Sequence, residues 1–574
     1  TNQTKSCTTN IDTSKDHTTY IQALDEAGNL TKSTIAKVSK GITGNSKWNK
    51  EKQANKPELA EGMIPIKYNG TKWVTTTEDD EDWYNYNESG SDYESKWANI
   101  MLSDGKYKSD TVEAGTEIEE SDLGSMFVWI PRYAYKIENG YHSSTAGDIS
   151  IEFLEGTSSH KTGVDIGSYP EYSYSETESE SKMNNYVVHP AFNYDETQLT
   201  GLWIAKFIAS RTDATNSSSG SSEQIKVVGN KYVYSNINVG EMYTACIGMN
   251  DTGNSYGLTS NDETVDPHLM KNMEWGAMAY LTQSKYGLNK IEARETSNNL
   301  AGYDYSKNVV CASTKNIYGI YDLESNYSYK IYEAVSAYVD NGNANLTSNG
   351  SELISAPKKH KDVYKVGTTG NILSNTISDT LKDNYEATKE KYGDSQYETS
   401  YGNNGNTRSW YYNYNSVPYT QYPFMVRGYY NYGIFGVNIS DGAKYSAFTF
   451  RPTIAVIDEN PSENIQITAD VTTPRNTSFT GDNNGVAAGP ITVTINYGET
   501  SLQKQYKEGI SGTWKTVSEN TKQIKVTSNE TIYARYYDGT NGIKTKSYTI
   551  ANVDNESPNS FKTYNNYVEG TGIE

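Results

Sequence analysis

The residue types in this sequence that could do redox or metal chemistry are few. Cys7, Cys246 and Cys311 form no Cys-x-x-Cys pair and have no metal-site spacing to any of the six histidines. Cys246 and Cys311 either pair or remain two buried thiols, and the second interpretation is favoured because free cysteine is commonly buried. No His-Glu-x-x-His or phosphate-binding Gly-Lys-Ser/Thr motif is present, so metalloprotease and nucleotide chemistry have no anchor.

Carboxylates are abundant, but none of their groupings has the spacing of a known site. Glu78–Asp82 offers oxygen ligands for Ca²⁺, yet it lacks the Asp-x-Asp-x-Asp-Gly spacing that wraps one ion, which favours a solvated acidic loop. Asp394 and Glu398 are linked as a glycosidase pair only by proximity in sequence. His189 and His268 lack a partner at motif spacing and are interpreted as structural histidines. The sequence therefore predicts no catalytic site and no metal site.

Tyrosine is the chemically informative residue type that this sequence concentrates. The chain has 50 Tyr and 9 Trp in 574 residues, and these rings supply large contact areas at little entropic cost. Trp410, Tyr411 and Tyr412 begin a Tyr- and Asn-rich run before Pro418 and Pro423. This run either forms an aromatic platform for a glycan or a protein surface, or it packs alternate rings inward and stiffens a long loop.

Length and charge narrow the class of protein. The chain carries 71 Asp and Glu against 50 Lys and Arg, a net charge of -21, which argues against binding to nucleic acid or anionic lipid. No run approaches the roughly 18 apolar residues of a membrane helix. We expect any secretion signal or anchor to lie outside these residues. The length predicts about two to four domains.

The two ends of the chain resemble each other. Residues 19–36 and 531–551 each combine an alternating strand, a polar turn with Gly and Asn, and a second alternating strand, which predicts a hairpin. Alternation within 491–526 extends the second copy to an antiparallel sandwich of about a hundred residues. This module resembles bacterial immunoglobulin-like (Ig-like) domains, fully over 459–556 and as a C-terminal part over 1–40.

Between the two modules lies a longer and less regular block. Residues 41–60 are interpreted as a linker from their Gly, Asn, Lys and Pro content, and 61–458 as an α+β domain with extensive loops. Residues 557–574 would begin a further module or form a linker. Inside the block, apolar residues at three- and four-residue steps predict a helix over 270–287 with Gly287 at its C-cap.

Several motifs of this block together resemble one known family. They are Gly201-Leu-Trp-Ile-Ala-Lys-Phe207, the helix 270–287, Gly319-Ile-Tyr-Asp-Leu323, and Arg427-Gly428 followed by Phe450-Arg-Pro452. Their order and intervals are similar to the C-type lectin-like fold of the formylglycine-generating enzyme (FGE) and sulfatase-modifying factors, over 61–458. Gly62–Pro65 and Gly124–Arg132 are similar to a version found in surface proteins of gut Firmicutes and their prophages. The resemblance implies one compact unit in which Gly201–Phe207 lies close to Arg427–Pro452.

The family contains enzymes and binders, and the stretch between Arg427 and Arg451 separates them. The enzymes oxidise a cysteine with a copper-binding cysteine pair in this stretch, which here contains no Cys and no His. The resemblance therefore implies neither thiol oxidation nor copper binding. Some relatives bind calcium near the turn that follows Asp322. Here a longer polar segment replaces the usual Gly-containing turn, so we expect no cofactor and leave calcium open.

The binders include the variable proteins of diversity-generating retroelements, which contact their ligands through this same stretch. Adenine-directed mutagenesis enriches Asn, Tyr and Ser there, and one departure here is Tyr429, where the family usually has a second Gly. The resemblance implies a binding patch of Tyr429, Tyr430, Asn431, Tyr432, Asn438, Ser440 and Tyr445, with Trp410, Tyr411 and Tyr412 beside it. Phe450, Arg451 and Pro452 should be buried, because a scaffold must stay fixed.

The sequence thus predicts a non-enzymatic, extracellular ligand-binding or adhesion protein that displays a tyrosine-rich surface on Ig-like stalk modules. It would act on a bacterial cell surface or pilus, with a protein or glycan of a host or neighbouring cell as its partner. Neither nucleic acid nor membrane contact is expected, and self-assembly is left open. The alternatives are a phage tail-fibre receptor-binding protein on a virion, a carbohydrate-active enzyme with an aromatic cleft, and a filament subunit whose tyrosines make subunit contacts.

Overall fold

The computed structural model describes most of the chain and is dominated by β-sheets, with few helices. The described residues are 17–24, 30–38, 47–88, 93–195, 197–211, 224–260, 264–295, 300–325, 328, 330–366, 384–385, 388–403, 406–419, 421–457, 465–471, 487–488, 491–497, 503–509, 511–537, 542–550 and 553–554. The chain divides into two compact units. The large unit is 47–458, and the small unit joins 1–46 with 459–574.

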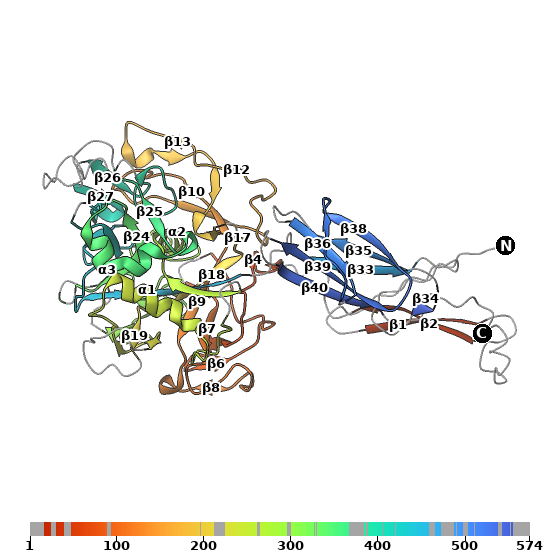
Figure 1. Cartoon of the computed structure of the whole chain (residues 1–574). Helices are drawn as coiled ribbons and strands as arrows, with labels where there is room; N and C mark the ends of the chain where they lie inside the picture. Colours follow the sequence, from red (N-terminus) through yellow and green to blue (C-terminus); the bar gives the residue numbers. More distant parts are fainter. Residues whose placement is uncertain are drawn as a thin grey trace. The chain divides into compact units, whose positions relative to one another are not determined.

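The large unit is built around an eight-stranded antiparallel sheet (Figure 1). In order across the sheet, its strands are β22 (Val265–Leu269), β32 (Pro452–Val456), β18 (Gly201–Ala205), β9 (Met126–Pro131), β7 (Asn99–Leu102), β5 (Met63–Tyr68), β6 (Trp73–Thr75) and β8 (Glu117–Ile118). Strands β9 and β18 are buried along their whole length. Both faces of the sheet are covered there, which explains why these strands read as continuous apolar runs.

A second sheet carries two of the motif residues, Arg427 and Phe450, each at the end of its strand. Its strands are β25 (Asp362–Tyr364), β24 (Tyr332–Val339), β29 (Phe424–Arg427) and β30 (Asn438–Ser440), and β31 (Phe448–Phe450) pairs in parallel with β24. Two smaller sheets are β11 (Ile149–Phe153), β10 (Tyr133–Ile137), β15 (Tyr186–Val188) and β12 (Ile166–Gly167), and β26 (Ser400–Asn403), β27 (Asn406–Ser409) and β28 (Tyr414–Asn415).

Three α-helices are described: α1 (Val239–Ile247), α2 (Asn272–Gln283) and α3 (Ala344–Ser355). Helix α1 packs against α3 and β22, whereas α2 packs against β24 and β11 (Figure 1). The predicted helix is confirmed as α2, but its C-cap is Ser284 rather than Gly287. Every residue of α2 is buried. Helices α1 and α3 were missed because α1 is short and α3 is mostly polar, with a non-helical Gly350 inside it.

The expected closeness of the two motif segments is confirmed. In the main sheet β18 pairs antiparallel with β32, so that Trp203 lies opposite Ile454. Phe450, Arg451 and Pro452 are buried, as predicted. The guanidinium of Arg451 donates to Glu333 at 2.9 and 3.0 Å and to the Ala205 carbonyl at 2.8 Å. This arginine therefore ties β24 and β18 to the strand that follows it.

Residues 47–60 belong to the large unit rather than to a linker. Strands β3 (Trp48–Asn49) and β4 (Ala54–Asn55) pair with each other. The Asn55 amide donates to the Thr200 carbonyl at 2.9 Å, and the Trp203 indole donates to the Glu58 carbonyl at 2.6 Å. The polar residues that suggested a linker make long-range hydrogen bonds instead. These bonds fix the segment to the main sheet.

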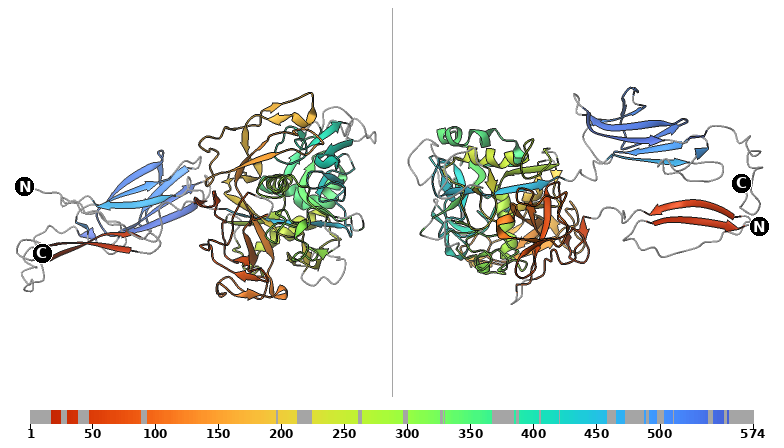
Figure 2. Two further views of the ribbon diagram at one scale, coloured as in Figure 1. Left: turned by 180° about the vertical axis from the view of Figure 1, so that it is seen from behind. Right: turned by 90° about the horizontal axis from the view of Figure 1, so that it is seen from below.

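In the small unit the two predicted hairpins are confirmed. Strand β1 (His17–Leu24) pairs antiparallel with β2 (Leu30–Val38), drawn in red in Figure 2, and β39 (Glu530–Tyr537) pairs with β40 (Gly542–Ile550). One sheet joins β33 (Gln466–Val471), β35 (Ile491–Asn496) and β38 (Thr521–Val526), and another joins β37 (Lys515–Val517), β36 (Gln503–Glu508), β39 and β40. Apolar side chains of both sheets share one core. Residues 557–574 lie outside the described residues.

Candidate ligand-binding surface

The predicted binding stretch is held in place by a buried arginine at its start. Arg427 ends β29, and the loop 428–437 connects β29 to β30. Its guanidinium donates to the Asn272 side chain at 2.9 Å and to the carbonyls of Phe435 and Gly436 at 3.1 and 3.2 Å. Because Asn272 begins α2, one side chain fixes both ends of the loop to the helix.

Helix α2 supplies a second attachment. The indole of Trp275 donates to the Ile434 carbonyl at 2.7 Å, and the apolar residues Ile434 and Phe435 are buried. The loop thus anchors its centre in the core. Its preceding residues, Tyr429 to Tyr432, are left partly buried or exposed.

Six tyrosines and one arginine form a continuous surface, which we call the tyrosine surface. It consists of Tyr332, Arg408, Tyr412, Tyr414, Tyr429, Tyr430 and Tyr432. Tyr429 is the branching point, with ring centroids 5.6 Å from Tyr332, 6.0 Å from Tyr430 and 5.5 Å from Tyr432. Tyr432 in turn lies 5.9 Å from Tyr414. These tilted and edge-on contacts are the arrangement that aromatic pairs prefer.

Arg408 joins the other end of the surface. It lies in β27, between Tyr401 and Tyr414 on the neighbouring strands. The centre of its guanidinium is 3.8 Å from the ring centroid of Tyr414 and 4.9 Å from that of Tyr412. Tyr412 and Tyr414 are 68% and 47% exposed, so their rings remain open to a partner while the cation holds them.

Two of the predicted platform residues do not belong to this surface. Trp410 is fully buried; its indole donates to the Gly140 carbonyl at 2.8 Å, and its ring packs 4.9 Å from Phe435. Tyr411 is partly buried, and its hydroxyl donates to the Gln283 side chain at 2.8 Å. Both predictions fail for the same reason: each ring has an inward hydrogen-bond partner on a distant segment. Tyr412 is exposed, as predicted.

The remaining predicted binding residues also divide into buried and exposed side chains. Ser440 is buried, and its hydroxyl accepts from the Gly442 amide, so it cannot contact a ligand. Asn431 is exposed and Asn438 is partly buried. Tyr445 is exposed and donates to Asp441 at 3.0 Å; its hydroxyl also raises the pKa of Tyr332, after the larger effect of burial. Tyr445 therefore borders the tyrosine surface at Tyr332.

The residues of the tyrosine surface that sequence reasoning did not name are Tyr332, Arg408 and Tyr414, although Tyr414 lies in the 410–415 run that was interpreted as an aromatic platform. Tyr414 follows the predicted Tyr412 by two residues, and this alternation was the available signal. Arg408 and Tyr332 had no signal, because cross-strand pairing in β27 and ring contact with Tyr429 bring them to the surface.

An open, acidic depression adjoins the tyrosine surface. Its polar lining residues are Glu292, Arg294, Glu295, Glu324, Asn413 and Asn431. The Asn413 amide donates to Glu292 at 2.6 Å, and the Asn431 backbone N–H donates to Glu324 at 3.2 Å. Burial, then the nearby carboxylates of Glu292 and Glu295, raise the pKa of Glu324 to about 8. Crowded carboxylates thus lie on the side of the 412–414 segment to which Asn413 points.

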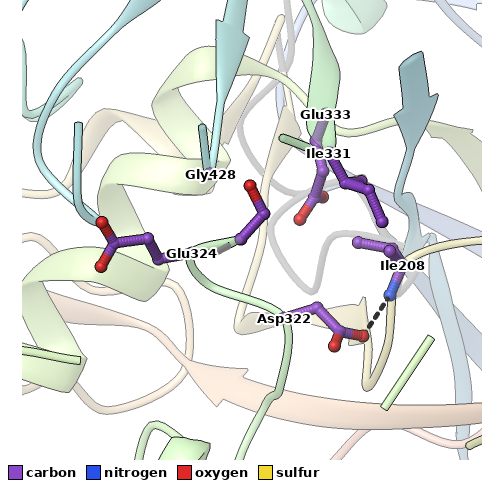
Figure 3. A pocket seen from close by; sticks show the side chains of 7 residues that line it. Ile208, Asp322, Glu324, Ile331, Glu333 and Gly428 are labelled. Atoms are coloured by element: carbon purple, nitrogen blue, oxygen red, sulfur yellow. Dashed lines mark hydrogen bonds between the residues drawn. The ribbon is translucent and has the colours of Figure 1, made fainter. Parts of the chain in front are cut away.

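The turn after Asp322 borders a small cavity of about 10 Å³, room for about one water (Figure 3). Asp322 accepts from the backbone amides of Ile208 and Gly302, and Glu333 accepts from Arg451. Glu324 points away from both of these carboxylates (Figure 3). The carboxylates beside this turn therefore serve as acceptors for backbone and guanidinium groups.

Asp394 and Glu398 are both buried. Glu398 accepts hydrogen bonds from the hydroxyls of Tyr135 and Tyr280 at 3.0 and 2.8 Å and from the Gly393 amide at 2.6 Å. Burial raises its pKa to about 7. This geometry is that of a core hydrogen-bond network rather than of a catalytic pair that flanks a substrate.

Asp266, His268 and His360 bring together a carboxylate and two imidazoles, donor types that transition metals use, with ligand atoms within 4.8 Å of one another. Each ring already has protein partners. His268 bonds Glu274 at 2.9 Å and the Tyr194 hydroxyl at 3.1 Å, while His360 bonds Asp266 at 2.9 Å and the Tyr243 hydroxyl at 2.9 Å. The hydrogen-bonded interpretation of His268 is confirmed, and the cluster has the form of a structural network.

Other sequence interpretations have mixed outcomes. Cys246 and Cys311 are free and buried, as favoured. His189 accepts from the Ala191 amide, but its Nε2 atom has no hydrogen-bond partner within the described part of the chain. The sequence contains one Gly-x-Ser-x-Gly pattern, Gly253–Gly257, which is the spacing of a hydrolase nucleophile. It lies in turns rather than between a strand and a helix, so it does not form the nucleophile elbow of a hydrolase.

Compared with models of known protein families and with curated proteins, the chain matches no family model and no curated sequence. Among the described residues, no helix combines the length and the apolar character needed to cross a membrane.

Proposed function

We propose that this chain is an extracellular, non-enzymatic binding protein whose large unit is a C-type lectin-like domain of the FGE type, from the binding branch of that family. Ig-like modules over 1–40 and 459–556 would carry it as stalks on a bacterial surface or pilus. The partner would be a protein or a glycan of another cell, and the proposed binding uses the side chains of the chain itself rather than copper.

One observation carries this proposal: the tyrosine surface is open, continuous and mounted on rigid elements. Tyrosine and arginine dominate the energetic centres of recognition surfaces, because they give large contact areas and directed hydrogen bonds at low entropic cost. Arg427 and Trp275 fasten the loop beneath these rings to α2. The rings are therefore ordered before a partner arrives, which lowers the entropic cost of binding.

The residues give enzyme functions little support. The stretch between Arg427 and Arg451 contains no Cys or His, so thiol oxidation has no redox ligand there. Asp394 and Glu398, the pair considered for glycoside hydrolysis, are buried against tyrosine hydroxyls and backbone amides. A binding role, by contrast, uses the exposed side chains of the tyrosine surface.

A paired-variant binding experiment tests the proposal. The purified chain would be applied to a glycan array and to a panel of intact bacterial and epithelial cells. A Tyr412→Ala/Tyr414→Ala variant should lose most of the binding. The matched control is Tyr169→Ala/Tyr174→Ala, which removes two tyrosines that are 74% and 65% exposed and belong to another part of the large unit. Equal binding by both variants would remove the tyrosine surface as the site.

A further inference from the structure

Arg408 in β27 is a cation that has no ion-pair partner among the described residues. The chain carries 71 acidic against 50 basic residues, yet no carboxylate forms an ion pair with Arg408 anywhere in the described ranges. Its hydrogen bond to the chain is a long one, from Nη1 to the Tyr412 carbonyl at 3.5 Å. By comparison, the buried Arg451 has Glu333 and the Ala205 carbonyl as acceptors.

Stacking holds the guanidinium of Arg408 although it lacks an anion. The group lies 3.8 Å from the ring centroid of Tyr414 and 4.9 Å from that of Tyr412. Arg408 also occupies the middle strand of its sheet, where Tyr401 is its other cross-strand neighbour. The nearby carboxylate of Glu178 raises the pKa of Tyr401. The carboxylate of Glu178 is thus used by a neighbour of Arg408.

The charges around the tyrosine surface are separated by direction. Asn413 points to Glu292 and the acidic depression, whereas Tyr412 and Tyr414 contact Arg408. The depression combines the carboxylates of Glu292 and Glu295 with Arg294, whereas the guanidinium of Arg408 lies on the side of Tyr412 and Tyr414. The site for an anion is therefore defined by one guanidinium between two exposed rings.

We propose that Arg408 binds the carboxylate or sulfate group of an acidic saccharide whose sugar ring stacks on Tyr412 or Tyr414. This inference rests on the proposed function and names its ligand class. A planar guanidinium presents a fork of N–H donors that matches carboxylate and sulfate oxygens. The guanidinium lies within about 5 Å of both ring centroids, so the anionic group and the sugar of one acidic monosaccharide unit can meet the cation and the part of a ring that the cation leaves uncovered.

An open surface favours a saccharide over an acidic protein segment. A protein partner brings its carboxylate and its apolar contact on separate side chains, and its energetic centre usually fills an enclosed pocket. Tyr412 and Tyr414 are 68% and 47% exposed, and Arg408 is itself only partly buried. One ring that carries its own anionic group needs no enclosing pocket to make both contacts.

Matched acidic and neutral probes test the inference by biolayer interferometry. The probes are sialyllactose against lactose, a galacturonate oligomer against the galactose oligomer, and a sulfated galactose oligosaccharide against its unsulfated form. An acidic peptide of alternating Glu and Tyr is added as a protein-like probe. We expect the chain to bind at least one acidic saccharide tenfold or more tightly than its neutral counterpart. Comparing the first two pairs with the third separates carboxylate from sulfate as the anionic group.

Two variants connect the preference to the residue. Arg408→Gln keeps polarity but removes the charge, and it should abolish the preference with a loss of tenfold or more for the acidic probe. Arg408→Lys keeps the charge without the fork and should give an intermediate loss. Tyr169→Ala is the control and should bind like the unmodified chain. Circular dichroism establishes that each variant is folded; if Arg408→Gln is not, Arg408→Lys decides, and a preference unchanged by it overturns the inference.

The results that would overturn this inference differ from those that would overturn the proposed function. Equal binding of acidic and neutral saccharides, or an unchanged preference in Arg408→Gln, overturns the inference while leaving the tyrosine surface as a binding site. Binding of the acidic peptide in preference to every saccharide also overturns it, since the ligand class would then be protein. If no saccharide binds, the inference fails, and the cell-binding experiment with Tyr412 and Tyr414 variants still decides the proposed function separately.

Discussion

Two regions of the large unit are rich in tyrosine, and they differ in where the hydroxyl groups find partners. Around Glu398, Tyr135 and Tyr280 are fully buried, and both hydroxyls donate to one carboxylate. In the tyrosine surface, Tyr412 and Tyr414 stay exposed. The guanidinium of Arg408 lies against both rings, and the ring of Tyr414 also contacts Tyr432. A tyrosine becomes a core residue where a buried acceptor is available, and otherwise its polar tip favours the surface.

The largest effect is expected in the buried region. Replacing Tyr280 by Ala removes a fully buried ring and leaves Glu398 without one donor. We expect a loss of about 3–5 kcal/mol in the free energy of unfolding, measured by urea denaturation. Tyr174→Ala is the control: this ring is 65% exposed, and its removal should cost less than about 0.5 kcal/mol. Similar losses of unfolding free energy in both variants would show that buried and exposed tyrosines contribute equally to stability.

The carboxyl group of Glu398 should make the buried region pH-dependent. Burial raises its pKa to about 7 from an ordinary value of 4.5. Below pH 4.5 the group is protonated in both states. Between 4.5 and 7 the unfolded chain releases this proton while the folded chain retains it, so stability falls as the pH rises and levels off above 7.

At about 1.36 kcal/mol per pKa unit, this effect is on the order of 3 kcal/mol. Glu398→Gln keeps an acceptor for the two tyrosines and removes the titration. Its free energy of unfolding should therefore fall less between pH 5 and pH 8 than that of the unmodified chain. Some pH dependence should remain, because burial also raises the pKa of Glu333 to about 7. Identical pH profiles would show that Glu398 does not hold its proton in the folded state.

Gly436 lies where the two segments that carry most of the tyrosine surface, 412–414 and 429–432, approach each other. A Cβ atom at Gly436 would lie 2.3 Å from the carbonyl oxygens of both Tyr414 and Tyr432. Gly436→Ala should push these segments apart, cost about 1–3 kcal/mol of stability and weaken ligand binding. Gly248→Ala is the control, since its Cβ would meet only Asp251 at an ordinary 3.4 Å. Unchanged binding with lowered stability would mean that the ligand uses only one half.

The smallest effect on stability is expected within the tyrosine surface itself. Tyr432→Ala should cost about 1–3 kcal/mol of binding free energy but less than about 1 kcal/mol of unfolding free energy. Its ring contacts Tyr414 and Tyr429, which are themselves partly open. Thermal melts and binding isotherms on the same protein would measure both quantities. A strongly lowered melting temperature would place Tyr432 with the core tyrosines instead.

The sequence determined those features that depend on local pattern. Alternation predicted both hairpins of the small unit, and three- and four-residue steps predicted α2, because backbone geometry repeats along the chain itself. The motif residues Phe450, Arg451 and Pro452 were correctly expected to be buried. The resemblance predicted exposed side chains over 429–432, where the tyrosines are half-buried and Asn431 is exposed.

Only the tertiary structure decided which aromatic residues face outward. Trp410 and Tyr412 look alike in the sequence, but Trp410 finds its acceptor on Gly140, 270 positions away, and is buried. Tyr411 likewise finds Gln283 at a separation of 128 positions. Arg408 joins the surface through strand pairing that no local pattern announces. A buried polar group must be satisfied by whatever partner the fold brings near it, and that partner is not encoded next to it in the chain.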